Sequence, residues 1–227
     1  MPSPPETELL PREFFARPAV QVAPDLLGCV LVHQTAEGLV AVRLTEVEAY
    51  AGASDPASHA FRGRTARNAV MYGPPGHTYV YFTYGMHFCV NLVCYAPDSA
   101  SAVLLRAGEV VAGPELAARR RLAAHRRAAA GSGVARVADR DLARGPGRLC
   151  QAMGIDRALD GADACDPGGP LRIRAGDAGV AEICQGPRVG VSRAAEVPWR
   201  YWLAGDRTVS PYRAHTPKRR GNPSARP

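Results

Sequence analysis

The chain has 227 residues, with 28 Lys and Arg against 21 Asp and Glu, which gives a formal net charge of +7. This length is enough to bury the core of one sizeable domain, and we expect a single domain. No apolar run approaches the length of a membrane span, which excludes an integral membrane protein, and the positive charge suits a partner that carries phosphates.

The first elements predicted along the chain are a helix and a hairpin. Residues 10–28 predict a short helix that ends at Gly28. Two runs of apolar and β-branched residues, 29–35 and 39–50, predict strands that are joined by the turn Ala36-Glu37-Gly38. Residues 51–77 are too polar and too rich in Gly and Pro for a regular element, and a long loop in a compact domain is more often functional than idle.

A second hairpin is predicted in the most aromatic part of the chain. Residues 78–95 contain two aromatic and β-branched runs that meet at Tyr84-Gly85-Met86, so that a tyrosine lies at the tip. Another strand is expected over 101–111. An Ala- and Arg-rich helix should begin at Pro114 and break at Gly131-Ser132-Gly133.

The last third of the chain predicts one more helix and several strands. The segment 145–155 reads "GPGRLCQAMGI", which predicts a short helix opened by Gly-Pro-Gly and stopped at Gly154. Further strands are predicted over 171–176, 180–192 and 199–205. Strands dominate and few helices interrupt them, so the predicted fold class is α+β: one domain around a curved, largely antiparallel sheet with a protruding β-hairpin.

Both ends of the chain lack residues that could join a core. Residues 1–10 are Pro-rich and polar, and residues 213–227 are Pro-rich and basic. We therefore expect a folded domain over 11–212 between two loose ends. The N-terminus has no basic stretch followed by an apolar run, so we expect no leader peptide and a cytoplasmic protein.

The cysteines and histidines do not predict a metal site. The cysteines form no C-x-x-C pair and no Cys/His spacing typical of zinc, so they are interpreted as free thiols; they are Cys29, Cys89, Cys94, Cys150, Cys165 and Cys184. The histidines have no ligand spacing either; they are His33, His59, His77, His87, His125 and His215. No metal and no organic cofactor are expected.

Two glutamates interrupt the second predicted strand. In "AVRLTEVEAY" the alternation of side chains along a strand predicts that Val42, Leu44, Glu46, Glu48 and Tyr50 share one face. Burying carboxylates without partners is costly, so this face should meet cations, donors or a water-filled pocket. For a glutamate taken at random, pairing with arginine at a sheet edge is the commoner explanation. Here the strand leads into a loop with His59 and several arginines, which favours a lined pocket where a carboxylate could activate water.

The aromatic hairpin offers a contrast between its strand and its tip. Tyr79, Tyr81 and Thr83 should share one face of their strand, and for Tyr79 we favour packing in the core. A hairpin tip cannot bury a large aromatic against its own sheet, so Tyr84 should be exposed. An exposed aromatic side chain at the tip of a hairpin in a basic protein is typical of residues that insert between stacked bases. A residue that contacts another protein would give the same sequence pattern.

Three segments of the sequence resemble a known family. The segments 46–94, 102–113 ("AVLLRAGEVVAG") and 145–155 look like the alkyladenine (3-methyladenine) DNA glycosylase family, in consistent order between Phe14 and Leu203. The resemblance implies a monomeric base-excision-repair enzyme that acts on double-stranded DNA. It would flip a damaged purine out of the duplex and hydrolyse the N-glycosidic bond without a metal or organic cofactor.

The resemblance also implies roles for individual residues. Glu48 matches the general base that activates water, Arg106 the arginine beside that water, and Val191 the residue whose backbone carbonyl helps to hold it. The residues that match the family's base pocket are Tyr50, His59, Tyr81 and Asn91. Expected DNA contacts are Tyr84, which would take the place of the flipped nucleotide, Met86 beside it, and Arg64, which we expect to touch backbone phosphate.

Two other functions are compatible with parts of this pattern. A DNA-binding module of the same fold without catalysis is disfavoured because both Glu48 and Arg106 are present. A glycosylase that also nicks the strand would need an amine, but the only lysine is Lys218, in the C-terminal tail. Removal of Met1 would expose the secondary amine of Pro2, which has no evident anchor near a site.

Overall fold

The computed structural model describes residues 7–83, 85–128, 136–176 and 182–216. Its strands are β1 (Val30–Thr35), β2 (Gly38–Ala51), β3 (Thr78–Thr83), β4 (His87–Cys94), β5 (Ser101–Ala112), β6 (Ala143–Arg144), β7 (Leu171–Arg174), β8 (Ile183–Gly186) and β9 (Arg200–Leu203). Its α-helices are α1 (Arg12–Phe15), α2 (Ala19–Asp25), α3 (Pro114–Ala128) and α4 (Pro146–Met153). Short 3-10 helices lie over Gly52–Ser54, Ala69–Tyr72, Asp139–Asp141 and Arg157–Leu159.

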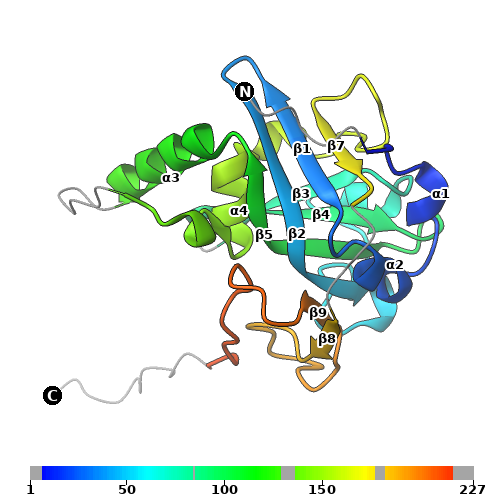
Figure 1. Ribbon diagram of the computed structural model, residues 1–227. Coiled ribbons are helices and arrows are strands. Elements are labelled where there is room, and N and C mark those ends of the chain that lie inside the picture. The colour runs from blue at the N-terminus through cyan, green and yellow to red at the C-terminus, as the bar shows by residue number, and fades with distance from the viewer. Residues whose placement is uncertain (1–6, 84, 129–135, 177–181, 217–227) are drawn as a thin grey trace, which may run out of the picture.

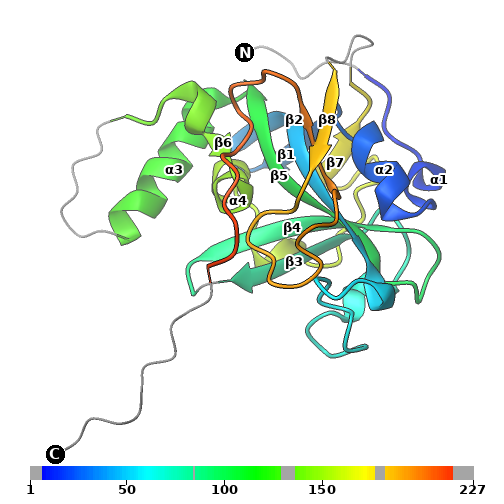
Figure 2. The same ribbon diagram turned by 90° about the horizontal axis from the view of Figure 1, so that it is seen from below.

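The strands form one antiparallel sheet in the order β3-β4-β5-β2-β1-β7 (Figure 1). β2 is long enough to pair with two strands along one edge: its first half pairs with β1 and its second half with β9. Along its opposite edge β2 pairs with β5. Figure 2 shows β3 and β4 running across the direction of β1 and β2, so the sheet is strongly curved. The predicted α+β class with a largely antiparallel sheet is confirmed.

Helices flank the strands at two ends, and residues of α1, α2, α3 and α4 all join the same hydrophobic core. In Figure 1, α3 and α4 lie on one side of the strands and α1 and α2 on the opposite side. The amphipathic α4 buries Leu149, Cys150, Ala152 and Met153 against the main core and ends at Gly154, whose φ of 73° is left-handed. The helix predicted over 145–155 is therefore confirmed. Within the described residues, no helix is long and apolar enough to cross a membrane.

Several predicted elements need correction. The single helix expected before Gly28 is two helices, because Pro18 lacks an N–H and disfavours helical geometry at Arg17, so that α2 restarts after it. Residues 180 and 181 of the strand expected over 180–192 lie outside the described residues; of the described part, only Ile183–Gly186 form a strand, β8, and residues 187–192 form a loop. Residues 8–10 were expected to be loose but pair with β7, since Leu10 N–H donates to the carbonyl of Ile173 at 2.9 Å.

The predicted alternation along β2 is wrong at one point. The pairing with β5 steps from Leu44 opposite Gly108 to Glu46 opposite Ala107, so Thr45 is an extra residue, a β-bulge. Before it, the even positions Val40, Val42 and Leu44 face the main core; after it, the odd positions Val47 and Ala49 do. A shift by one residue exchanges the two faces of a strand. The bulge therefore turns Glu46, Glu48 and Tyr50 away from the core that Val42 and Leu44 enter.

Candidate active site

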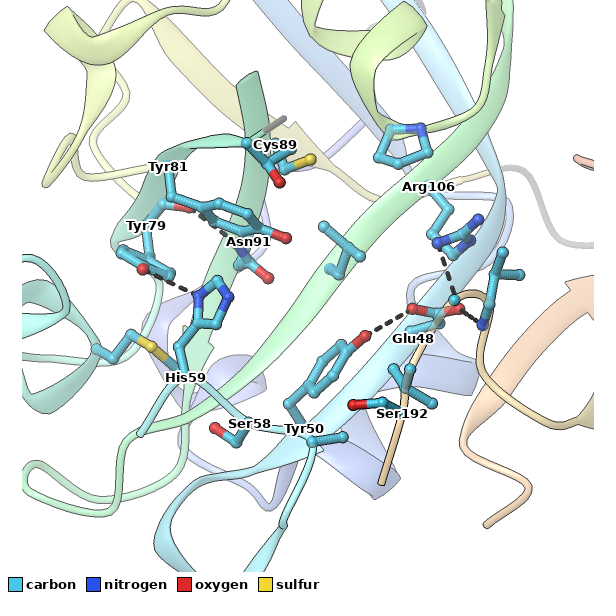
Figure 3. A pocket seen from close by; sticks show the side chains of 18 of the residues that line it. Glu48, Tyr50, Ser58, His59, Tyr79, Tyr81, Cys89, Asn91, Arg106 and Ser192 are labelled. Atoms are coloured by element: carbon cyan, nitrogen blue, oxygen red, sulfur yellow. Dashed lines mark hydrogen bonds and ion pairs between the residues drawn. The ribbon is translucent and has the colours of Figure 1, made fainter. Parts of the chain in front are cut away.

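A pocket of about 330 Å³ opens where β2, β3, β4 and β5 meet two loops (Figure 3). The loop after β2 supplies one rim and the loop after β8 another. This volume is typical of small-molecule sites. The lining residues are Glu48, Tyr50, Pro56, Ala57, Ser58, His59, Met71, Tyr79, Tyr81, Thr83, Cys89, Asn91, Leu104, Arg106, Pro146, Val189, Gly190, Val191 and Ser192.

Glu48 lies at one end of the pocket, and its side chain is fully buried. Its Oε1 accepts the backbone N–H of Val189 at 2.7 Å and lies 3.3 Å from Nη1 of Arg106. Its Oε2 accepts the hydroxyl of Tyr50 at 2.8 Å. Of the residues that the structure describes, only Tyr50 donates to Oε2, so this oxygen can still accept a hydrogen bond from a molecule in the pocket.

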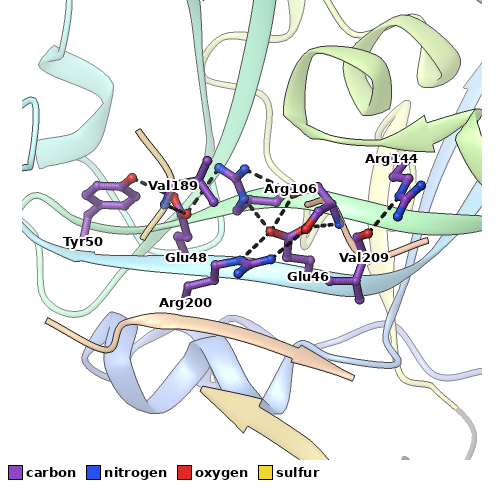
Figure 4. Close-up of polar contacts among 9 residues, drawn as sticks. Glu46, Glu48, Tyr50, Arg106, Arg144, Val189, Arg200 and Val209 are labelled. Carbon is purple, nitrogen blue, oxygen red and sulfur yellow. Dashed lines mark hydrogen bonds and ion pairs between the residues drawn. The ribbon is translucent and has the colours of Figure 1, made fainter. Parts of the chain in front are cut away.

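Glu46 has a different environment although it is only two residues away (Figure 4). Its Oε1 accepts from Nε of Arg106 at 2.8 Å and from Nε of Arg200 at 2.7 Å. Ser210 donates its backbone N–H to Oε2 at 2.7 Å and its hydroxyl to Oε1 at 2.9 Å. Burial alone would raise the pKa of Glu46, but Arg106 and Arg200 outweigh it and lower the pKa. Glu46 is thus a structural carboxylate held by two arginines and Ser210, and it does not line the pocket.

Arg106 joins the two glutamates because of a second bulge. The pairing steps from Glu46 opposite Ala107 to Val47 opposite Leu105, which leaves Arg106 as the extra residue of β5. Burial acts to lower the pKa of Arg106, but the charges of Glu48 and Glu46 more than offset it and raise that pKa. The guanidinium is therefore a permanent cation shared by one structural carboxylate and one that faces the pocket.

Three aromatic rings face Glu48 from the other side of the pocket (Figure 3). The rings of Tyr79 and Tyr81 are stacked at 5.5 Å, and His59 meets Tyr81 edge to face at 4.5 Å. The hydroxyl of Tyr79 lies 3.1 Å from Nδ1 of His59. Burial, with Arg67 nearby, lowers the pKa of His59 and so favours a neutral imidazole. The core packing predicted for Tyr79 is confirmed, but its hydroxyl also fixes His59, which the sequence did not indicate.

Three further residues that line the pocket, Tyr50, Cys89 and Asn91, are neutral as well. Burial, and next the charge of Glu48, raises the pKa of Tyr50 well above its ordinary value, so Tyr50 stays a protonated donor. Burial similarly raises the pKa of the Cys89 thiol. Asn91 donates Nδ2 to the carbonyl of Tyr79 at 3.0 Å, which leaves its Oδ1 as a hydrogen-bond acceptor.

The structure brings seven of the predicted site residues to this one pocket. These are Glu48, Tyr50, His59, Tyr81, Asn91, Arg106 and Val191. Met86 is 61% exposed just before β4, outside the pocket. Arg64 is also exposed, with its guanidinium 5.6 Å from the ring centre of Tyr72. Tyr84 lies outside the described residues. The roles that the family resemblance implies for these residues stay predictions.

Two contributions to the site were missed from the sequence. The backbone group that contacts Glu48 is the N–H of Val189, two residues before the predicted Val191. Arg188, just before it, is wholly buried and paired with Asp55. The motif "RVGV" contains Arg188, Val189 and Val191, but the family resemblance points only to Val191. No pattern along the chain indicates that Asp55 is the partner of Arg188.

This arrangement combines a neutral aromatic cleft with one carboxylate that can accept a further hydrogen bond. A flat heterocycle fits between such rings, and a carboxylate at the end of the cleft can orient and deprotonate water. Among the described residues, no three His, Cys, Asp or Glu side chains are grouped as ligands of a metal ion.

Comparison with known proteins supports a single family. The sequence pattern of the family described as Methylpurine-DNA glycosylase (MPG) matches residues 13–207. The chain is 57% identical over 219 residues to a protein of Streptomyces avermitilis, covering 95% of this chain and 97% of that protein. It is 53% identical over 208 residues to a protein of Leifsonia xyli subsp. xyli, covering 90% of this chain and 92% of that protein. Both relatives are named "Putative 3-methyladenine DNA glycosylase". The chain therefore belongs to the methylpurine-DNA glycosylase family.

Proposed function

We propose that this protein is a DNA glycosylase that removes damaged purines from double-stranded DNA by hydrolysis. The observation that carries the proposal is the position of Glu48. Its carboxylate is held by Tyr50, Val189 and Arg106 at the end of an aromatic pocket, with one oxygen able to accept from a bound molecule. Family membership and the names of the relatives support the same activity.

The target base has to leave the duplex to reach this pocket. Unstacking costs a few kcal/mol and costs least for a damaged base, which contributes to selection. A purine alkylated at N3 or N7 is cationic, and the rings of Tyr50, His59 and Tyr81 can attract its face by roughly 1–3 kcal/mol per contact. The neutral state favoured for His59 suits this step, because an imidazolium would repel a cationic base.

Hydrolysis then depends on the carboxylate. As the N-glycosidic bond stretches, the sugar gains positive charge, which the anion of Glu48 stabilises. A water that donates to Glu48 loses its proton to the carboxylate as its oxygen attacks C1′. The pair of electrons of the broken bond leaves with the purine, and an abasic site remains. Arg106 and the carbonyl of Val191 are proposed to help orient this water.

A binding module without catalysis would not need this geometry. Glu46 receives four hydrogen bonds from the protein and lies outside the pocket, whereas Glu48 lines the pocket and has an oxygen that can accept from a bound molecule, as a general base requires.

The direct test is the release of free base. The purified chain is incubated with methylated DNA and with duplexes that contain a single hypoxanthine or 1,N6-ethenoadenine, and released purines are separated by chromatography. We expect free damaged purine and an abasic strand from at least one substrate. Tight binding without release from any of them would favour the binding module instead.

We also expect the enzyme to be monofunctional. A lyase needs an uncharged amine that attacks C1′ and forms a Schiff base. Between Pro11 and Pro217 the chain has no lysine, so no lysine side chain of the pocket can supply that amine. The product strand should stay intact until alkali or heat is applied, and borohydride should trap no protein–DNA adduct. A trapped adduct that disappears when the amine of Pro2 is blocked would show that this amine attacks C1′, and the water mechanism would then be wrong.

Tyr84→Ala is expected to weaken the flipped state, because nothing then fills the gap left in the base stack. A 2-aminopurine beside the lesion reports flipping by its fluorescence, and the signal should fall in this variant. Phe15→Ala is the comparison: Phe15 is buried and does not line the pocket, so its loss should act through stability. An unchanged 2-aminopurine signal in Tyr84→Ala would contradict the prediction that Tyr84 takes the place of the flipped nucleotide.

A further inference from the structure

Arg188 and Asp55 form an ion pair that is buried completely, just behind the wall of the pocket. Both side chains have 0% exposure, and neither residue lines the pocket. The guanidinium contacts the carboxylate through two parallel bonds, Nη1 to Oδ2 at 2.5 Å and Nη2 to Oδ1 at 2.9 Å. Burying two charges is costly, and a buried pair is weak grounds for stability alone. Because this buried ion pair lies next to the pocket, a role in arranging the site explains its presence better than a contribution to stability.

The pair ties together the segments that carry the site. Nη1 of Arg188 also donates to the carbonyl of Ala49 at 3.0 Å. Oδ2 of Asp55 accepts the backbone N–H of Ala51 at 3.3 Å, and its Oδ1 accepts that of Ala57 at 3.0 Å. Ala49 and Ala51 are the neighbours of Tyr50, and Ala57 begins the rim that leads to His59. Two of these bonds thus fix the backbone on either side of Tyr50, and the third fixes the backbone of the rim at Ala57.

The same guanidinium also packs against the ring of Tyr50. Its central carbon lies 4.7 Å from the centre of that ring and 5.2 Å from that of Trp199. A planar cation can stack on aromatic faces in this way, and contact on two rings restricts its own movement. Tyr50 is therefore held through its neighbouring backbone and through its ring, while its hydroxyl points at Glu48.

The second connection to Glu48 runs along the backbone. Val189 follows Arg188 directly, and its N–H donates to Oε1 of Glu48 at 2.7 Å (Figure 4). An anchored Arg188 fixes where this N–H points. Two of the three groups that hold the Glu48 carboxylate, the Tyr50 hydroxyl and the Val189 N–H, are thus set by one ion pair.

We propose that Arg188 and Asp55 are positioning residues for the excision reaction: their ion pair aligns Tyr50 and Val189 so that Glu48 is held in the orientation that activates water. This inference rests on the proposed function. It assigns no contact with DNA or with the reacting atoms to either residue. A misplacement of about 1 Å at a reacting group can cost about 100-fold in rate, so the pair can matter without touching the substrate.

The experiment is a double-mutant cycle on single-turnover release, with a duplex lesion that the wild-type protein excises. Asp55→Asn keeps the shape of the side chain but removes its charge, and Arg188→Lys keeps the charge but loses the two parallel bonds. Each change is made in the wild type and in Glu48→Gln. The assay temperature is one at which thermal melting shows every variant to be folded. Binding of the same duplex is measured in parallel.

The matched control is Asp163→Asn. Asp163 forms an ion pair with Arg12 at 2.5 Å, and neither of these residues lines the pocket. This variant receives the same chemical change in an Arg–Asp pair and should excise at the wild-type rate while it is folded. This control separates the effect of losing any Arg–Asp ion pair from the effect of losing the pair between Arg188 and Asp55.

We expect Asp55→Asn and Arg188→Lys to lower the excision rate about 10- to 100-fold in the wild type. In Glu48→Gln the same changes should cost less than about threefold, because residues that act through a shared partner are not additive. Binding of the duplex should change little. Equal losses in both backgrounds, or a normal rate in the folded single variants, would refute the positioning role. A normal rate for Glu48→Gln itself would instead refute the proposed function.

Discussion

Glu48→Gln is expected to lower the single-turnover excision rate by about 10²–10⁴, the usual cost of losing one positioned general base. The amide has the shape of the carboxylate and can still accept the N–H of Val189, so the pocket should persist. It cannot take a proton from water at neutral pH. Binding of damaged duplex, measured by fluorescence anisotropy, should therefore survive while release of the base collapses.

Glu46→Gln is the matched control on the same strand. Glu46 receives four hydrogen bonds and does not line the pocket, so its replacement should lower the midpoint of urea unfolding more than the rate of the folded protein. A larger loss of rate in folded Glu46→Gln than in Glu48→Gln would contradict the assignment of Glu48.

Arg106→Met is expected to lower both stability and activity. It removes the cation shared by two fully buried carboxylates, and breaking a buried pair in this way typically costs about 3–5 kcal/mol. Activity should fall as well, because Glu48 loses the charged neighbour at 3.3 Å. Urea denaturation measures the first effect and single-turnover release the second.

The loss of stability in Arg106→Met should depend on pH with a definite sign. The pKa of Glu46 is lowered in the folded protein, so this carboxylate contributes stability above its unfolded pKa of 4.5 and loses it as the pH falls through the lower folded value. The difference between wild type and variant should thus be largest near neutral pH and shrink in acid. The control is Arg43→Met, whose side chain is 33% exposed in its pairs with Glu109 and Asp206 and should contribute less than about 1 kcal/mol. Equal losses for the two variants would argue against a buried network at Arg106.

Local sequence determined the elements that carry the site. The hairpins β1–β2 and β3–β4 follow from β-branched and aromatic runs around short turns, which are short-range signals. The alternation along β3 correctly placed Tyr79, Tyr81 and Thr83 on one face, because that strand has no bulge and its pairing with β4 is regular. Motifs that resemble a family then pointed to seven residues that the fold gathers around one pocket.

Only the tertiary structure decided which way the second half of β2 faces and what holds Glu48. The bulges at Thr45 and Arg106 arise from how β2 and β5 pair, and neither strand alone shows an extra residue. The partners Asp55 and Arg188 are 133 residues apart, and no local propensity connects them. The contact between Val189 and Glu48 uses a backbone N–H, a group that almost every residue has. Such contacts carry no signature in residue type, because they depend on where the folded backbone brings a donor.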